Sequence, residues 1–134
     1  MTQALSRKIP IRSESDIVEA RRLGRELARE IGFGLVDQTR IATGISELTR
    51  NVVRYAGEGV LTLAPVSLGD RRGLEITCED HGPGIPDIER ALRGGSGRGG
   101  GLGLGIPGTK RLMDEFKIRS LVGIGTTVVV RKWL

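Results

Sequence analysis

Hydrophobic residues recur three and four positions apart in two long stretches of the chain, which is the spacing of one face of an α-helix. In the first stretch these positions are Ile17, Ala20, Leu23, Leu27 and Ile31. In the second, from about residue 36 to residue 55, they are Ile41, Ile45, Leu48, Val52 and Tyr55. The cap-forming residues 13–16 precede the first stretch, and Gly32 and Gly34 follow it. We therefore expect two amphipathic helices that pack against a common core.

Shorter segments alternate apolar and polar residues or are rich in β-branched side chains, as strands are. These segments are residues 8–12, 60–67, 73–79, 118–122 and 126–132. Polar or glycine-containing turns at residues 69–72 and 123–125 predict hairpins. Further helices are expected at residues 86–92 and from Pro107 to about Phe116.

The order of these elements predicts an α+β two-layer sandwich. We expect a mixed, mostly antiparallel sheet with helices on one face. With 134 residues and no internal repeat, residues 1–134 are expected to form a single domain.

Composition narrows the classes of protein. No apolar run approaches the roughly 18 residues that cross a bilayer, and the N-terminal residues contain no apolar signal core. Cys78 is the only cysteine and has no internal partner for a disulfide, so we expect a cytoplasmic protein. The net charge is +5, but the basic residues are scattered and there are four aromatic side chains in all, which argues against a nucleic-acid partner.

Glycine is unusually frequent, with 21 residues, of which nine lie between Gly94 and Gly108. A cluster of this kind is either a linker or a loop whose backbone approaches a ligand. The flanking segments share one small core, which favours the loop. Peptide N–H groups without side chains form a site for anions, and a helix N-terminus follows.

Two polar groups could carry chemistry. Glu47 and Asn51 lie one helical turn apart, where a carboxylate can accept a proton and an amide oxygen can bind Mg²⁺. Taken alone, the pair is more typical of a solvated helix face. Asp80, followed by Gly82 and Gly84, leaves a strand and can accept a hydrogen bond from the adenine amine. The alternative is a tight turn in which Asp80 caps backbone amides.

Gly125, Thr126 and Thr127 open the last predicted strand. A threonine hydroxyl at this position could reach an adenine edge, directly or through water. Threonine also favours strands for ordinary reasons, so this signal is weak in isolation.

In order, these motifs resemble the GHKL ATPase and kinase superfamily, whose ATP site is called the Bergerat fold. The segments GFGLVDQTRIATGISELTRNVVRYAGEG, EDHGPGIPDIERAL and GIPGTKRLMDEFKI, with the terminal KWL, resemble the anti-sigma-factor serine kinases, in particular stressosome switch kinases of the RsbT type. The resemblance implies an ATP- and Mg²⁺-dependent serine/threonine protein kinase. It also implies STAS-domain scaffold proteins as substrates and a PP2C-type phosphatase, or its regulatory domain, as a partner. A homodimer is a possible further state.

The resemblance assigns roles to individual residues. Glu47 matches the catalytic base, Asn51 the Mg²⁺ ligand and Asp80 the acceptor for the adenine amine. Gly82 and Gly84 match residues that shape the adenine pocket, and Thr127, less securely Thr126, matches the threonine beside adenine. The phosphate-contacting lid corresponds to Gly99, Gly100, Gly101, Leu102, Gly103, Leu104 and Gly105.

Two other functions compete with a serine/threonine kinase. The alternative is an anti-sigma-like, nucleotide-sensing module that binds partners and is non-catalytic or weakly catalytic, because a glycine-rich lid loses preorganisation. A histidine kinase is disfavoured, since the only histidine, His81, lies inside the proposed adenine turn.

Overall fold

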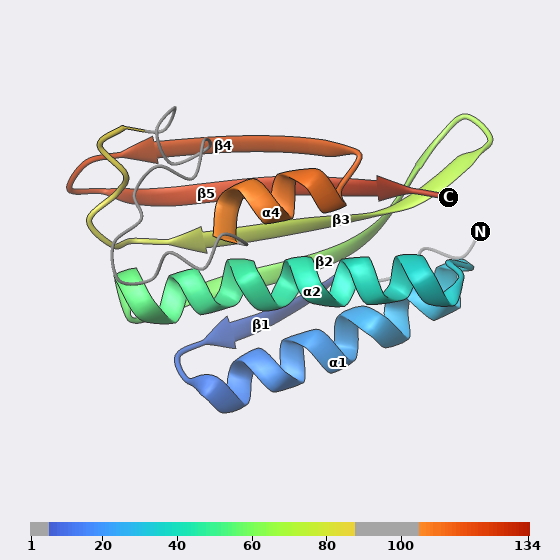
Figure 1. Cartoon of the computed structure of the whole chain (residues 1–134), viewed down its shortest axis with the longest axis horizontal. Coiled ribbons are helices and arrows are strands. Elements are labelled where there is room, and N and C mark those ends of the chain that lie inside the picture. The colour runs from blue at the N-terminus through green and yellow to red at the C-terminus, as the bar shows by residue number, and fades with distance from the viewer. Residues whose placement is uncertain (1–5, 88–104) are drawn as a thin grey trace.

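The computed structural model describes residues 6–87 and 105–134. Its elements are β1 (Arg7–Ile11), α1 (Glu14–Ile31), α2 (Leu35–Asn51), the π-helical turn η1 (Val52–Ala56), β2 (Gly59–Leu68), β3 (Arg71–Asp80), α4 (Gly105–Leu112), β4 (Glu115–Leu121) and β5 (Gly125–Trp133). The strands form one sheet in the order β1-β2-β3-β5-β4, and the helices cover one of its faces (Figure 1). The predicted two-layer α+β sandwich is confirmed.

The core lies between the helices and the sheet. Alternate residues of the central strands, including Leu61, Leu63, Leu74, Ile76 and Val130, are fully buried. They face the apolar stripe of α2, in which Ile41 and Ile45 are also fully buried. All described strand pairs are antiparallel, so the parallel pair of a mixed sheet is not found among them.

The helix expected from Pro107 to Phe116 ends earlier, at Leu112. The chain turns at Asp114, whose N–H donates to the Arg131 carbonyl at 3.0 Å, and β4 begins at Glu115. The alternation of partly buried Phe116 with exposed neighbours has the period of a strand. Of the helix expected at 86–92, the described residues 86 and 87 are not helical, and the rest lies outside the described residues.

Tyr55 was expected in the buried stripe of the second helix, and that prediction is wrong. Its side chain is 58% exposed, whereas Val52, one turn earlier, is buried. The α-helical pattern ends at Asn51 and continues as η1. A π-turn inserts an extra residue, so later side chains leave the face that a 3.6-residue period predicts.

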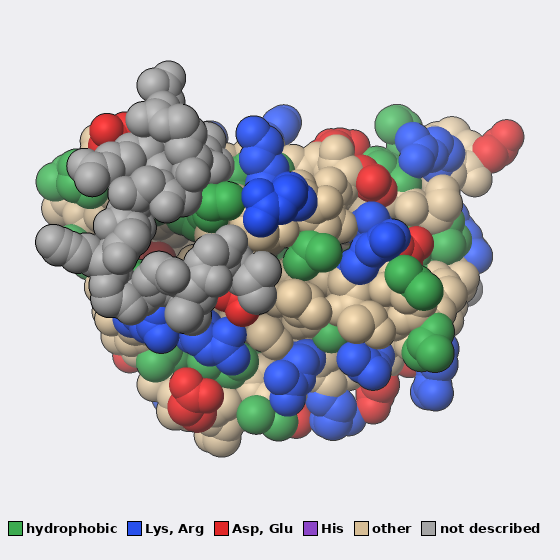
Figure 2. All heavy atoms as spheres, viewed as in Figure 1, with side chains coloured by type: hydrophobic (Ala, Val, Ile, Leu, Met, Phe, Trp, Pro, Cys, Tyr) green, Lys and Arg blue, Asp and Glu red, His purple; other side chains and the backbone are tan. Residues whose placement is uncertain are grey.

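Cys78 lies in the core on β3, as the alternation predicted. Burial raises the pKa of its thiol to about 12, with the nearby Asp80 and Glu79 charges adding to the effect. The helices of the described residues include none that is long and apolar enough to cross a membrane. Among the described residues visible on the helix-covered face, lysine and arginine side chains are spread among acidic ones and do not gather in one patch (Figure 2).

Candidate active site

One end of the sandwich brings together the end of α2, the end of β3 and the start of β5 (Figure 1). Gly59 pairs with Asp80 across β2 and β3, and a Cβ at Gly59 would lie 2.8 Å from Val52 Cγ1. A Cβ at Gly82 would lie 2.5 Å from Ala56 Cβ. Gly59 therefore allows η1 to pack against the paired ends of β2 and β3, and Gly82 allows it to pack against the turn that follows β3. This packing places the helix carrying Asn51 beside the turn that begins at Asp80.

Asp80 is half-buried at the end of β3. Its Oδ1 accepts a hydrogen bond from the Gly82 N–H at 2.8 Å, so the carboxylate does cap the turn. Within the described residues, no hydrogen bond is found to Oδ2. One oxygen thus fixes the side chain, and the other is left to accept a hydrogen bond from a ligand. The capping and the binding interpretations of Asp80 are compatible.

The two threonines of β5 lie on opposite faces of the sheet. Thr126 pairs with Asp80 on β3 and with Ser120 on β4, whereas Thr127 pairs with Glu79 and Arg119. Side chains that pair across strands share a face. The neighbouring pair Cys78 and Val128 is buried on the helix side, so Asp80 and Thr126 also face that side.

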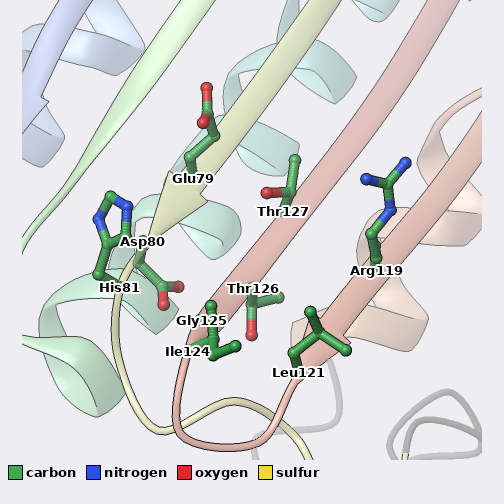
Figure 3. Close-up of a pocket in the computed structure, with 9 residues that line it drawn as sticks. All are labelled: Glu79, Asp80, His81, Arg119, Leu121, Ile124, Gly125, Thr126 and Thr127. Carbon is green, nitrogen blue, oxygen red and sulfur yellow. The ribbon is translucent and has the colours of Figure 1, made fainter.

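The sequence interpretation favoured Thr127 over Thr126, whereas the register pairs Asp80 with Thr126. Figure 3 shows Thr127 directed away from the Asp80 carboxylate, on the same side as Glu79. The structure brings Thr126 together with Asp80 and separates Thr127 from both. A one-residue step along a strand reverses the face, so only one of the two threonines shares the face of Asp80.

An open hollow of about 200 Å³ lies at these strand ends (Figure 3). Its lining residues are Glu79, Asp80, His81, Arg119, Leu121, Ile124, Gly125, Thr126 and Thr127. Three of these residues, Glu79, Arg119 and Thr127, belong to the face of the sheet without helices. We therefore distinguish this hollow from the purine pocket that the sequence predicts beside Asp80.

Glu47 is 8% exposed, so it does not belong to a solvated helix face. Its Oε2 accepts a hydrogen bond from Arg50 Nη1 at 3.0 Å. Asn51 is half-buried and ends α2 immediately before η1. A buried carboxylate paired with one cation is uncommon in a purely structural helix. The amide of Asn51 fits Mg²⁺, which takes one or two protein ligands beside phosphate oxygens.

The lid is described only at its end. Gly105 is the first residue of α4. The other predicted lid residues, Gly99, Gly100, Gly101, Leu102, Gly103 and Leu104, lie outside the described residues.

Sequence reasoning missed two residues that the structure places at this end. Arg54 is exposed on η1, with its guanidinium carbon 6.0 Å from the centre of the Tyr55 ring. The feature of the sequence that could have indicated Arg54 is a basic residue three positions after Asn51. Ser120 hydrogen bonds to Thr126, and nothing in the sequence distinguishes it from an ordinary strand serine.

Gly84 has φ +80°, and a Cβ there would collide with the Leu121 carbonyl oxygen. Gly123 has nearly the same φ, +81°, but open space around it. We expect Gly84→Ala to lower the free energy of unfolding by about 3 kcal/mol, because backbone strain and a backbone clash add together. Gly123→Ala, which adds strain alone, should cost about 1 kcal/mol. Urea unfolding of both variants checks this, and equal losses would show that the Gly84 contact is not tight.

Comparisons with known proteins place the chain in a family. The model of the histidine kinase-like ATPase domain matches residues 10–132. The chain is 52% identical to the serine/threonine-protein kinase RsbT of Bacillus subtilis (strain 168) over 126 residues, covering 94% of this chain and 95% of that protein. It is 33% identical over 107 residues to an anti-sigma F factor of Pasteuria penetrans, covering 75% and 71% of the two chains.

Solved structures share the fold at low sequence identity. A chain of the SiaB-SiaC complex from Pseudomonas aeruginosa aligns with a TM-score of 0.56 and 12% identity, over 98% of this chain and 91% of that one. The nucleotide-free catalytic domain of histidine kinase ThkA aligns with a TM-score of 0.52 and 16% identity, over 94% and 95%. The chain belongs to the histidine kinase-like ATPase family, within the branch that contains the serine/threonine-protein kinase RsbT.

Proposed function

We propose that this chain transfers the γ-phosphate of ATP to a serine or threonine hydroxyl of a STAS-domain partner protein in the cytoplasm. The observation that carries the proposal is the cross-strand pair of Asp80 and Thr126, set beside the helix that ends with Glu47 and Asn51. The likeness to RsbT over nearly the whole chain supports the kinase activity.

In this proposal the purine lies against the Asp80 turn. Asp80 Oδ2 accepts a hydrogen bond from the adenine N6 amine, while Oδ1 keeps its bond to the Gly82 N–H. Thr126 reaches the same edge of the ring from the neighbouring strand. Gly82 and Gly84 allow the turn to pack closely against η1 and the Leu121 backbone, which a Cβ at either position would meet. This close packing would shape the wall of the purine pocket.

The triphosphate extends toward α2 and the lid. Asn51 would hold Mg²⁺, which neutralises phosphate charge and orients the γ-phosphate when bound. Glycine-rich residues 99–105 would supply backbone N–H groups, and the start of α4 at Gly105 adds positive potential. Arg54, exposed on η1, would add a further cation at this end of the molecule.

Glu47 acts as the base for the incoming hydroxyl. Residues four apart share a helix face, so Glu47 and Asn51 point to the same side of α2. The Arg50 guanidinium holds one carboxylate oxygen at 3.0 Å, which fixes the orientation of the other. In this arrangement the base lies one turn from the Mg²⁺ ligand, as phosphoryl transfer to a hydroxyl needs.

The proposed partners follow from the relatives. RsbT and the anti-sigma F factors support a kinase that switches between partner proteins. We include a PP2C-type phosphatase, or its regulatory domain, and a second copy of this chain among the proposed partners.

The proposal is tested by incubating the protein with candidate STAS-domain proteins, ATP and Mg²⁺. Mass spectrometry should detect a single added phosphate on a serine or threonine, and omission of Mg²⁺ should abolish it. If ATP binds and a STAS partner binds but no phosphate is transferred, the chain is a nucleotide-sensing module instead of a kinase.

A further inference from the structure

The strand β4, at one edge of the sheet, presents a row of exposed side chains on the face without helices. Within the described residues, β5 is its one strand neighbour. Lys117, Arg119 and Leu121 alternate along β4, and all three are exposed. Glu115 belongs to the same row, but its Oε2 accepts a hydrogen bond from Trp133 Nε1 at 2.6 Å. The row therefore offers two cations and one apolar side chain to solvent.

Neither of the two cations is neutralised by a neighbour. Their cross-strand partners on β5 carry no charge. In the part of the chain that the structure describes, the side chains of Lys117 and Arg119 form no ion pair and no hydrogen bond. Arg131, on the same face of β5, is by contrast paired with Glu75 at 2.8 Å. The positive charge on this face is thus left uncompensated along β4.

An apolar turn continues the row beyond β4. Leu121 is 54% exposed, and Val122 and Ile124 are 67% and 60% exposed. The Gly123 N–H donates to the Pro83 carbonyl at 2.8 Å, which ties this turn to the loop after β3. Leu121 and Ile124 also line the open hollow of about 200 Å³ (Figure 3). Neighbouring apolar side chains that are exposed on a fixed backbone mark interaction sites, and a preorganised surface loses little entropy on binding.

We propose that β4 binds an extended acidic segment of a partner protein, which adds to the sheet as a further strand antiparallel to β4. An edge strand carries N–H and C=O groups that can pair with such a segment. Opposite residues of an antiparallel pair share a face and interact. The segment therefore places an apolar residue opposite Leu121 and acidic residues opposite Arg119 and Lys117, in that order along its chain. Its pattern is apolar-x-acidic-x-acidic.

A second copy of this chain fits the β4 edge less well than an acidic partner does. Two β4 strands paired antiparallel along their full length would set Lys117 of each copy against Arg119 of the other. Like charges directly opposite each other are destabilising. The net charge of +5 adds a general repulsion between copies. Because a lysine on an edge strand discourages pairing of identical chains, the charges favour a different protein of opposite sign.

This site is separate from the proposed nucleotide site. Lys117 and Arg119 lie on the face of the sheet without helices, whereas Asp80 faces the helices. A segment bound along β4 leaves the Asp80 turn and the end of α2 accessible. The inference therefore goes beyond the proposed function and does not require ATP.

Fluorescence anisotropy with synthetic peptides and the full chain tests the inference. The probe is a fluorescein-labelled seven-residue peptide with valine at its second position, glutamate at its fourth and sixth, and threonine elsewhere. The control peptide has the reverse order and so keeps the composition and the charge. We expect the probe to bind about fivefold more tightly, because the reversed peptide cannot match Leu121, Arg119 and Lys117 together in any antiparallel register.

Charge reversal separates recognition from a loss of stability. The double variant Lys117→Glu, Arg119→Glu should bind the probe about 30-fold more weakly, because two attractions become two repulsions. The same variant should bind a peptide with lysines in place of the glutamates about as tightly as the wild type binds the probe. A destabilised protein would not gain this affinity. Thermal unfolding accompanies each variant.

Lys8→Glu is the matched control for charge reversal. Lys8 is also an exposed lysine on the face without helices, but it lies on β1, at the opposite edge of the sheet. Its reversal should leave the affinity for the probe within about twofold of wild type. Amide chemical shifts of the ¹⁵N-labelled protein should change at residues 117–122 when the probe is added.

Several results would overturn the inference. These are failure of the probe to bind, equal binding of the probe and the reversed peptide, no preference of the double variant for the lysine peptide, or shift changes confined to the helices. If sedimentation shows a wild-type dimer that Lys117→Glu, Arg119→Glu dissociates, β4 pairs with a second copy and the acidic partner is wrong. None of these results bears on ATP binding, so the proposed function stands or falls by its own test.

Discussion

Replacing Asp80 by asparagine should weaken ADP binding by about 100-fold. The asparagine Oδ1 can still accept the hydrogen bond from the Gly82 N–H, which is 2.8 Å long in the structure, so the turn is retained. The second oxygen becomes an NH₂ group and points a donor at the donor amine of adenine. Losing a charge-assisted bond and leaving two donors face to face costs about 3 kcal/mol in a half-buried site. Calorimetry with ADP and Mg²⁺ measures the change.

Asp16→Asn is the matched control for this experiment. Its Oδ2 accepts a backbone hydrogen bond from Arg12 at 2.8 Å, a bond of the same length, at the start of α1. It should leave ADP affinity unchanged. Equal affinity of wild type and Asp80→Asn would remove adenine from this position, and a large loss of thermal stability in Asp80→Asn alone would mean that the capping role dominates.

The fold was accessible from the sequence because its core obeys simple periods. The stripe from Ile41 to Val52 repeats at three and four residues, and Leu74, Ile76 and Cys78 alternate along β3. Both patterns come from one buried face, which is the feature that a linear sequence records best. The helix N-terminus at residues 13–16 and the turn at Gly69 were visible for the same local reason.

The wrong predictions of secondary structure and burial occur where the hydrophobic spacing does not reveal a change in backbone geometry. Tyr55 fits a helical stripe by spacing, but η1 changes the number of residues per turn before it. The end of α4 and the start of β4 were misplaced because Phe116 fits both a helix face and a strand face. Neither the π-turn nor the chain reversal at Asp114 leaves a distinctive residue in the sequence.

The residues of the proposed site were found in the sequence for a different reason. Two short motifs carry them, Asp80 with Gly82 and Gly84, and Glu47 with Asn51. Each motif lies within one segment, so it can be recognised without knowing how the strands pair. The choice between Thr126 and Thr127 needs the register of β3 on β5, which pairs Asp80 with Thr126. The contact between Ser120 and Thr126 needs the register of β4 as well. Long-range register is what a motif in one segment cannot contain.

Replacing Glu47 by glutamine should lower the rate of phosphate transfer by about 1,000-fold and leave ADP affinity within about twofold of wild type. A positioned general base contributes about 10²- to 10⁴-fold, and the amide that replaces it cannot accept the hydroxyl proton. Glutamine has nearly the same shape and can still accept the hydrogen bond from Arg50, which is 3.0 Å long. The expected defect is therefore chemical, and single-turnover assays with saturating ATP and a STAS-domain substrate isolate it.

Glu75→Gln provides the matched control on the other face of the sheet. Glu75 is also ion-paired with an arginine, since its Oε2 lies 2.8 Å from Arg131 Nη2, and it is partly buried. Its loss should change neither transfer nor ADP binding, which shows that removing a paired carboxylate is harmless away from the site. Undiminished transfer by Glu47→Gln would assign the base to another group. Loss of ADP binding in the same variant would instead make Glu47 part of the nucleotide pocket, because a residue that acts only on the hydroxyl proton has no effect before the γ-phosphate moves.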